Sequence, residues 1–214
     1  MITFPEFNKI PRLNRNCTIT EKIDGTNGVI HIEGDQILVG SRTRWITPED
    51  DNFGFARWVD CNKQELLKLG PGTHYGEWWG GSIQRGYGLQ EKRFSLFDTA
   101  RWDDPLVRPA CCGIVPVLYS GLFTTDVVGT AIERLKTLGS EAAPGFMEAE
   151  GVVIYHEAAG QMFKVTIKGD EKGKETEAHL KKERAPRPPK DPSKGGRRIA
   201  QMVFEGVDRR RNKL

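Results

Sequence analysis

The hydrophobic pattern of the first forty residues predicts β-strands. Residues 18–23 and 28–33 alternate between apolar and polar side chains, which is the period of a half-buried strand. These two segments flank Asp24-Gly25, a pair that is typical of a tight turn. Residues 36–40 repeat the strand pattern after a second turn. The chain therefore begins with three predicted strands.

Two later segments have the spacing of helices. Apolar residues recur at helical intervals over residues 53–69, and the pattern stops at the glycines and proline of residues 70–72. A second amphipathic pattern covers residues 126–138 and stops at Gly139. Both segments are predicted as helices.

More strands complete the pattern up to residue 169. Residues 151–155 and 161–167 predict a hairpin. Single strands are predicted at residues 73–79, 94–98 and 113–118, and residues 41–52 and 80–88 are predicted as loops. Together these elements predict an α+β domain, rich in antiparallel strands, over residues 1–169.

The pattern fails in the tail, residues 170–214. The prolines of residues 185–192 predict a linker, and residues 197–211 predict a short basic helix. The tail holds 14 basic and 8 acidic residues, a net charge of +6, whereas residues 1–169 have a net charge of −3. A basic tail either binds a polyanionic partner or stays solvated, and both interpretations remain open.

Composition excludes several classes of protein. The chain holds no apolar run long enough to span a bilayer, and its N-terminus lacks the pattern of a signal peptide. We therefore expect a cytoplasmic protein that does not associate with a membrane. The cysteines and histidines lack metal-ligand spacing, and the vicinal Cys111-Cys112 pair is expected to be two reduced thiols.

The motif with the most chemical information is Glu21-Lys22-Ile23-Asp24-Gly25-Thr26-Asn27-Gly28. A single Lys-x-Asp-Gly match is weak, because many surface turns contain it. Here it precedes four further motifs in a fixed order, and independent chance matches to all of them become improbable together. These motifs lie at residues 75–77, 94–98, 150–154 and 163–168.

These motifs resemble those of enzymes in which a lysine attacks a nucleotide α-phosphate, and the residue types suit that chemistry. Lys22 can attack only as the neutral amine, so its pKa must be lowered by partial burial or by neighbouring cations, for which Lys164, Lys168 and Arg42 are the candidates. Charge that builds on the phosphates also calls for Mg²⁺ or Mn²⁺. Glu150 is the best metal-side carboxylate, because it opens an apolar strand where a charge is otherwise out of place.

These motifs resemble the covalent nucleotidyltransferases, which comprise polynucleotide ligases and mRNA capping enzymes. The segments at residues 21–27, 41–54 and 76–84 are most similar to the RNA ligase 2 family of ATP-dependent ligases. The resemblance covers about residues 18–170. It implies an antiparallel-sheet-rich nucleotidyltransferase domain (an ATP-grasp-like ligase adenylylation domain), in a minimal form without an OB-fold domain.

The resemblance also implies a role for each motif residue. Lys22 carries AMP, Glu150 organises the divalent metal, and Lys164 binds the α-phosphate. The other implied nucleotide contacts are Glu21 and Ile23 bordering the adenine, Asn27 at the nucleotide or phosphate, Arg42 at the ribose or phosphate, Glu77 at the ribose hydroxyls, and Phe97 stacked on the adenine with Asp98 beside it.

The last motif departs from the family pattern. Many relatives carry two lysines separated by one residue, whereas Lys164 is followed by Thr166 and then Lys168 on the same face of a strand. Either Lys168 supplies the second charge or Thr166 replaces it with a hydroxyl group. The aromatic loop with Trp78, Trp79, Arg85 and Tyr87 either stacks on bases or packs its tryptophans inward.

The expected function is therefore an ATP-dependent ligase of RNA or other polynucleotide ends, acting as a monomer through a lysyl-AMP intermediate and an adenylylated 5′ end. One alternative is a GTP-dependent guanylyltransferase of the capping type. The other is a non-catalytic nucleic-acid-binding homologue of a ligase.

Overall fold

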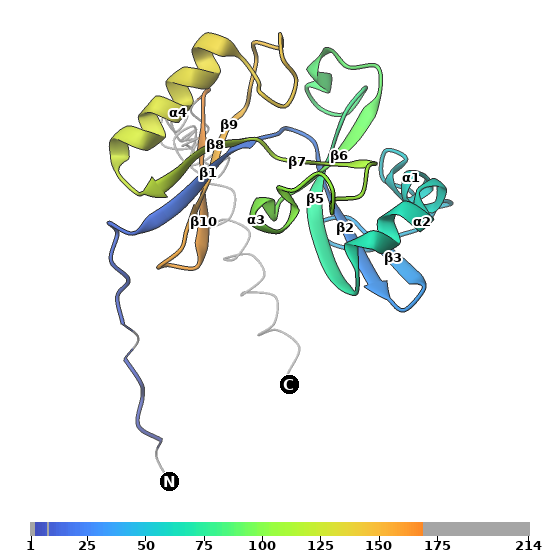
Figure 1. Ribbon diagram of the computed structural model, residues 1–214, viewed down its shortest axis with the longest axis horizontal. Helices are drawn as coiled ribbons and strands as arrows, with labels where there is room; N and C mark the ends of the chain where they lie inside the picture. The colour runs from blue at the N-terminus through green and yellow to red at the C-terminus, as the bar shows by residue number, and fades with distance from the viewer. Residues whose placement is uncertain (1–2, 8, 169–214) are drawn as a thin grey trace, which may run out of the picture. The chain divides into compact units, whose positions relative to one another are not determined.

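A computed structural model describes residues 3–7 and 9–168 (Figure 1). The predicted linker and basic helix of the tail lie outside the described residues. Two sheets and four α-helices make up the described part, which confirms the α+β fold rich in antiparallel strands. Within this part, no helix has the length and apolar character needed to cross a membrane.

The smaller sheet has four strands in the order β10-β9-β1-β8, and each pair of neighbouring strands in it is antiparallel. Its strands are β1 (Asn16–Lys22), β8 (Val117–Leu122), β9 (Gly151–His156) and β10 (Gln161–Thr166). The hairpin predicted from residues 151–167 is confirmed as the pair β9 and β10.

The larger sheet has six strands in the order β4-β3-β2-β5-β6-β7. Neighbouring strands in this sheet are antiparallel, except for β6 and β7, which are parallel to each other. Its strands are β2 (Thr26–Glu33), β3 (Gln36–Gly40), β4 (Trp45–Ile46), β5 (Gly72–Gly80), β6 (Lys92–Leu96) and β7 (Cys112–Ile114).

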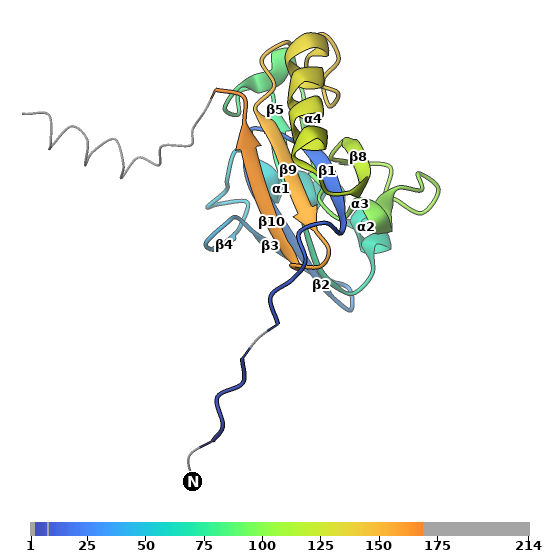
Figure 2. The same ribbon diagram turned by 90° about the vertical axis from the view of Figure 1, so that its left-hand side faces the viewer.

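Helices cover one face of each sheet. The long helix α4 (Thr125–Leu138) is confirmed and lies over the smaller sheet (Figures 1 and 2), with the Thr124 hydroxyl accepting from the backbone of Val127 at its start. The helix predicted at residues 53–69 is broken at Asn62, whose backbone is not helical. The shorter helices are α1 (Phe55–Cys61), α2 (Lys63–Leu66), α3 (Thr99–Trp102) and the 3₁₀ turns η1 (Leu67–Leu69) and η2 (Gly86–Gly88).

The chain passes twice between the sheets, and both passages correct the sequence prediction. The strands on either side of Asp24-Gly25 do not pair, because β1 belongs to the smaller sheet and β2 to the larger. The strand predicted at residues 113–118 is likewise divided into β7 and β8, which lie in different sheets. Both connections are visible at the centre of Figure 1, and the backbone N–H of Glu21 donates to the carbonyl of Pro116 at 2.9 Å.

Alternation along the strands assigns each sheet a buried face and an open face. On β1, Cys17 and Ile19 are fully buried in the cluster beneath α4, whereas Thr18, Thr20 and Lys22 point to the other side. On the larger sheet, α1 and α2 pack on a core cluster that includes Ile30, Ile32, Phe55, Val59, Leu66, Trp78 and Phe94. A third cluster lies at the two connections and consists of Ile23, Trp79, Tyr87, Val115 and Ala143.

The strand β2 requires glycine at residue 28 because of this core. A Cβ atom at Gly28 would lie 2.6 Å from Phe55 Cζ and 2.8 Å from Phe94 Cε2. We expect Gly28→Ala to lower the free energy of unfolding by about 1–3 kcal/mol. Gly129 lies exposed on α4 with nothing within 4 Å, so Gly129→Ala should raise it by about 0.5–1 kcal/mol. Urea denaturation of both variants checks the pair, and equal midpoints would contradict this account of the core.

Candidate active site

Lys22 ends β1 on the open face of the smaller sheet. Its Nζ lies 2.6 Å from Glu150 Oε2, and the two side chains are 24% and 15% exposed. Glu150 immediately precedes β9, and Lys22 is paired with Gly151, the first residue of that strand. The antiparallel register therefore brings together two residues that are 128 positions apart in the chain.

Glu77 approaches the same place from the larger sheet. It lies on β5 opposite Asn27 of β2, and its Oε1 accepts from the backbone N–H of Gly25 at 3.0 Å. The amide nitrogen of Asn27 donates to Glu77 Oε2 at 3.4 Å. A Cβ atom at Gly25 would lie 2.5 Å from the carbonyl oxygen of Trp78, so glycine is needed here because the backbones approach closely. The Asp24-Gly25 pair serves as a connection between sheets and not as a hairpin turn.

The site concentrates negative charge around one lysine. Burial raises the pKa of Glu77 to about 7, although Lys22 and the Gly25 N–H both favour its ionised form. Glu150 and Asp24 add to the increase, since each would repel a charge on Glu77. The carboxylate of Glu150 is the ion-pair partner of Lys22, and Lys168 pairs with Glu148. The closest charged contact of Lys22 is therefore anionic, where the sequence suggested cations.

The register of the smaller sheet arranges the last motif beside Lys22. Gly151 pairs with Lys22 on one side and with Thr166 on the other, so Lys22 and Thr166 share a face in one cross-strand row. Lys164 lies on the same face, one row further along, and is exposed. Glycine is required between Lys22 and Thr166, because a Cβ atom at Gly151 would lie 2.1 Å from the carbonyl oxygen of Val165. Lys168 follows the end of β10, beyond this row.

Two predicted site residues point away from Lys22. The carboxylate of Glu21 is 1% exposed and accepts from the Ser140 hydroxyl at 2.6 Å and from the backbone N–H groups of Glu141 and Ala142. Burial raises the pKa of Glu21, although these three hydrogen bonds oppose the increase. The side chain of Ile23 is buried in the cluster at the two connections. Their predicted contacts with adenine stay predictions, and their side chains are occupied elsewhere.

The side chains of Phe97 and Arg42, on segments next to strands of the larger sheet, are both exposed to solvent. Phe97 follows β6 and donates its backbone N–H to the carbonyl of Tyr75 at 3.0 Å, one row from Glu77 on the same face. Its side chain is 36% exposed. Arg42 lies exposed in the loop after β3 and makes no hydrogen bond or ion pair within residues 3–7 and 9–168.

The glycine-rich loop supports the connection after Lys22, and the sequence did not predict this. Arg85 Nε lies 2.8 Å from Asp24 Oδ2, and Arg85 also donates to the carbonyl of Glu148. The hydroxyl of Tyr87 accepts from the Asp24 backbone N–H at 2.7 Å. Trp78, Trp79 and Tyr87 are each 2% exposed, so the hypothesis that this loop stacks on bases is wrong and its rings pack inward.

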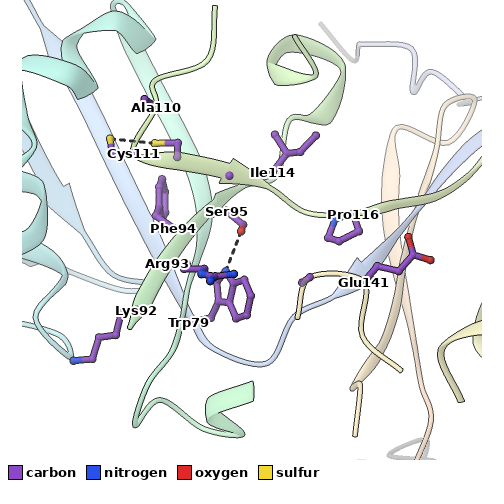
Figure 3. A pocket seen from close by; sticks show the side chains of 13 residues that line it. Trp79, Lys92, Arg93, Phe94, Ser95, Ala110, Cys111, Ile114, Pro116 and Glu141 are labelled. Carbon is purple, nitrogen blue, oxygen red and sulfur yellow. Dashed lines mark hydrogen bonds between the residues drawn. The ribbon is translucent and has the colours of Figure 1, made fainter. Parts of the chain in front are cut away.

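A separate pocket of about 380 Å³ lies beside β6 and β7 (Figure 3). Trp79 donates its indole N–H to Ser95 Oγ at its edge, and the Sγ atoms of Cys111 and Cys112 lie 3.9 Å apart as free thiols. Its lining includes none of the predicted nucleotide or metal contacts. The candidate site is instead the region where Lys22, Glu150 and Glu77 meet.

The sequence of residues 15–166 matches a family model described as RNA ligase. The chain belongs to the RNA ligase family. Sequence comparison with curated proteins finds no match.

Solved structures with the same fold include RNA ligases of Naegleria gruberi. A mutant in its apo form has a TM-score of 0.53 and 20% identity, and the match covers 76% of this chain and 52% of that one. A form with PPi has a TM-score of 0.50, 21% identity and covers 76% and 52%. A mutant with ATP and Mn has a TM-score of 0.50, 18% identity and covers 79% and 52%. This chain therefore spans about half the length of those ligases.

The donor set around Lys22 fits a divalent cation that takes most of its ligands from elsewhere. Among the described residues, no group of three or more His, Cys, Asp and Glu side chains is arranged to hold a metal ion. Mg²⁺ commonly binds through one or two carboxylates, water and substrate phosphates, without a full protein cage. Glu150 has the carboxylate oxygens that such a role requires, and among the described residues it accepts from the Lys22 amine.

The raised pKa of Glu77 makes stability depend on pH. Its folded pKa of about 7 lies above the unfolded value near 4.5, so the stabilising proton is fully bound below pH 4.5 and is lost as the pH rises through 7. Without nucleotide, wild type relative to Glu77→Gln should lose about 2.5 kcal/mol of unfolding free energy between pH 5 and pH 8.

Urea denaturation at the two pH values measures this loss. Glu133→Gln, on the exposed face of α4, serves as the matched control. An equal pH dependence in wild type and Glu77→Gln would mean that Glu77 is solvated.

Proposed function

We propose that this chain is an ATP-dependent RNA ligase that joins 5′-phosphate and 3′-hydroxyl ends through lysyl-AMP. The observation that carries the proposal is the contact region itself. A lysine amine lies 2.6 Å from Glu150 on one sheet, and a second buried carboxyl, Glu77, faces it from the other sheet. Membership of the RNA ligase family supports the choice of polynucleotide ends as the substrate.

In the first step, Lys22 Nζ attacks the α-phosphorus of ATP. A P–N bond forms, the bond to the bridging oxygen breaks, and pyrophosphate leaves. Glu150 Oε2 lies at hydrogen-bond distance from the amine and is positioned to hold the proton that the lysine must lose. In the second step the AMP passes to a 5′-phosphate, and in the third a 3′-hydroxyl displaces it to form the phosphodiester.

The remaining predicted residues would orient the nucleotide. Glu77 is placed to accept from the ribose hydroxyls, with Asn27 beside it, and Phe97 presents a partly exposed ring on the same sheet face. Lys164 and Arg42 are exposed cations, and we propose that Lys164 contacts the α-phosphate and Arg42 the ribose or a phosphate. Glu21 and Ile23 were predicted to border the adenine, and we now propose that they do so through their backbones, because their side chains are buried elsewhere.

The proposed cofactors are ATP and Mg²⁺ or Mn²⁺. Structures of the Naegleria gruberi ligase mutants are described with ATP and Mn, which supports the same pair here. A divalent ion held by Glu150 would supply charge stabilisation at the α-phosphate.

The domain organisation remains part of the proposal. We propose residues 1–169 as the adenylylation domain and residues 170–214 as a basic tail. A monomer in the cytoplasm stays a prediction from the sequence.

Two alternatives remain distinguishable. A capping-type guanylyltransferase would use GTP on the same lysine, and family membership argues against it. A non-catalytic homologue would have no need for an amine, a metal-side carboxylate and a buried ribose-side carboxyl in one place.

Substitution of Lys22 tests the first step. After incubation with ATP and Mg²⁺, wild type should gain the mass of one AMP, and Lys22→Ala should gain none. Lys22→Arg keeps the positive charge beside Glu150, yet arginine stays protonated and should also gain none. Intact mass spectrometry of protein first shown to be unmodified measures all three.

Other outcomes would redirect the proposal. An adduct on Lys22→Arg would assign the nucleophile to another residue. A gain of GMP from GTP would identify capping chemistry, and no adduct with Mg²⁺ or Mn²⁺ would favour the non-catalytic homologue.

The row that joins Lys22, Gly151 and Thr166 favours Thr166 over Lys168 as the replacement for the second lysine. We expect Thr166→Ala to slow lysyl-AMP formation by about tenfold or more, the cost of one hydrogen bond to a charged group. Lys168→Ala should change the rate by less than about threefold, because Lys168 is exposed and paired with Glu148. Rapid-quench rates of lysyl-AMP formation measure both, and the reverse order would assign the role to Lys168.

A further inference from the structure

The open face of the larger sheet carries a continuous row of side chains that leads away from Glu77. Trp45 pairs with Gly40, Gly40 with Val29, and Val29 with Tyr75, and the Phe97 N–H donates to the Tyr75 carbonyl. Residues directly opposite one another in antiparallel strands share a face. The row therefore crosses β4, β3, β2 and β5 on one side of the sheet and ends at Phe97, directly after β6.

A second row lies beside the first on the same face. Leu38 pairs with His31, and His31 pairs with Thr73. The His31 and Trp45 rings lie 6.3 Å apart between centroids, and His31 Nδ1 lies 2.8 Å from the Thr73 hydroxyl. We call the surface formed by both rows the aromatic face, with Trp45, Tyr75, Phe97, His31 and Leu38 as its members.

The members of the aromatic face are unusually exposed for their size. Trp45 and Tyr75 are each 57% exposed, Leu38 is 49% exposed and Phe97 is 36% exposed. The opposite face of the same strands packs Ile30, Ile32 and Trp78 against α1 and α2. Single exposed apolar residues are common, but a contiguous set on one sheet face marks an interaction surface.

The position of Gly40 contributes to the shape of this surface. A Cβ atom at Gly40 would lie 3.2 Å from Trp45 Cε3 and 3.3 Å from Val29 Cβ. The Trp45 ring therefore lies across the glycine, towards Val29, with part of its surface open to solvent. A ring in that position can accept a flat, unpaired base.

We propose that the aromatic face binds the unpaired bases of a single-stranded RNA end next to the nucleotide site. The inference rests on the proposed ligase function and deepens it, because it selects an unpaired strand over a continuous duplex as the substrate. Stacking on aromatic rings needs a free base face, which a base inside a duplex does not offer.

Continuity with the site favours RNA as the occupant over a protein partner. The row begins at Phe97, whose ring is proposed to stack on the adenine. An RNA strand bound along the row would therefore bring its end to the AMP on Lys22. Three strand spacings separate Tyr75 from Trp45, about 14 Å, which is long enough for more than one base.

The charges at the edge of the aromatic face agree with a phosphate backbone. Arg42 and Arg44 lie exposed in the loop that precedes Trp45. Two carboxylates near this edge are already engaged: Asp50 pairs with Arg44, and the Asp98 side chain accepts from the Arg101 backbone N–H. Arg42 has no such partner in the part of the chain that the structure describes, so its guanidinium can contact a phosphate.

The test compares ring removal with ring retention. Trp45→Leu and Tyr75→Leu keep apolar bulk without a stacking ring, whereas Trp45→Phe and Tyr75→Phe keep a ring. Phe7→Leu is the matched control, since Phe7 is 86% exposed and lies before β1. The probe is a labelled single-stranded RNA of about 12 nucleotides without a 5′-phosphate, within the usual size of single-strand sites. Such an RNA cannot be adenylylated, so fluorescence anisotropy measures binding alone.

We expect each Leu variant on the aromatic face to weaken binding by about fivefold or more, with the Phe variants and Phe7→Leu within about twofold of wild type. A blunt RNA duplex should bind equally to all of them. Equal loss in Leu and Phe variants, an equal effect on the duplex, or an unchanged affinity in both Leu variants would overturn the proposal.

Tryptophan fluorescence provides an independent measurement. Trp45 is exposed, whereas Trp78, Trp79 and Trp102 are at most 5% exposed and Trp58 is partly buried. Titration with the single-stranded RNA should quench wild-type fluorescence, and Trp45→Leu should lose most of that quenching. Quenching that survives in Trp45→Leu would count against a base stacked on this ring.

The two proposals fail in different ways. Lysyl-AMP formation is measured on every variant by intact mass. If wild type forms no adduct but the ring-dependent binding holds, the ligase function fails and the aromatic face stands. If the adduct forms and the ring variants bind normally, the aromatic face fails alone.

Discussion

The connection between β1 and β2 is the constraint on which the site depends. It takes the chain from one sheet to the other within three residues, so Lys22 ends on the smaller sheet while Asn27 already lies opposite Glu77 on the larger. The Gly25 N–H donates to Glu77, and no side chain fits at Gly25 because the backbone of β5 lies too close. The glycine-rich loop fixes the same connection through Arg85 and Tyr87. Small changes here would separate the amine from the facing carboxyl.

The electrostatics of the site follow from this geometry. Burial and like charges favour a proton on Glu77, whereas the Lys22 amine is held by Glu150. Three carboxyl groups near one lysine repel one another, and that repulsion costs stability. A cation and the hydroxyl groups of a nucleotide would relieve it. The arrangement therefore favours ligand binding over stability of the free protein.

In each sheet, one face packs against helices and the other carries the residues of the proposed site. Buried positions such as Ile19 and Ile30 pack against helices, while the alternate positions carry Lys22, Glu77 and the aromatic face. Glu21 is the exception, because its carboxylate points into the buried side and accepts three hydrogen bonds from residues 140–142. It holds the segment after α4 in place, close to the chain that leads to Glu150.

The sequence by itself determined the local elements and the order of the motifs. Alternation predicted β9 and β10 as a hairpin, helical spacing predicted α4, and the motif around Lys22 predicted the family, since all three signals are local in the chain. Only the tertiary structure decided that β1 and β2 lie in different sheets, that Glu21 is buried and that Thr166 shares a row with Lys22. Periodicity assigns a strand two faces but not its neighbours, because strand pairing depends on packing between distant segments.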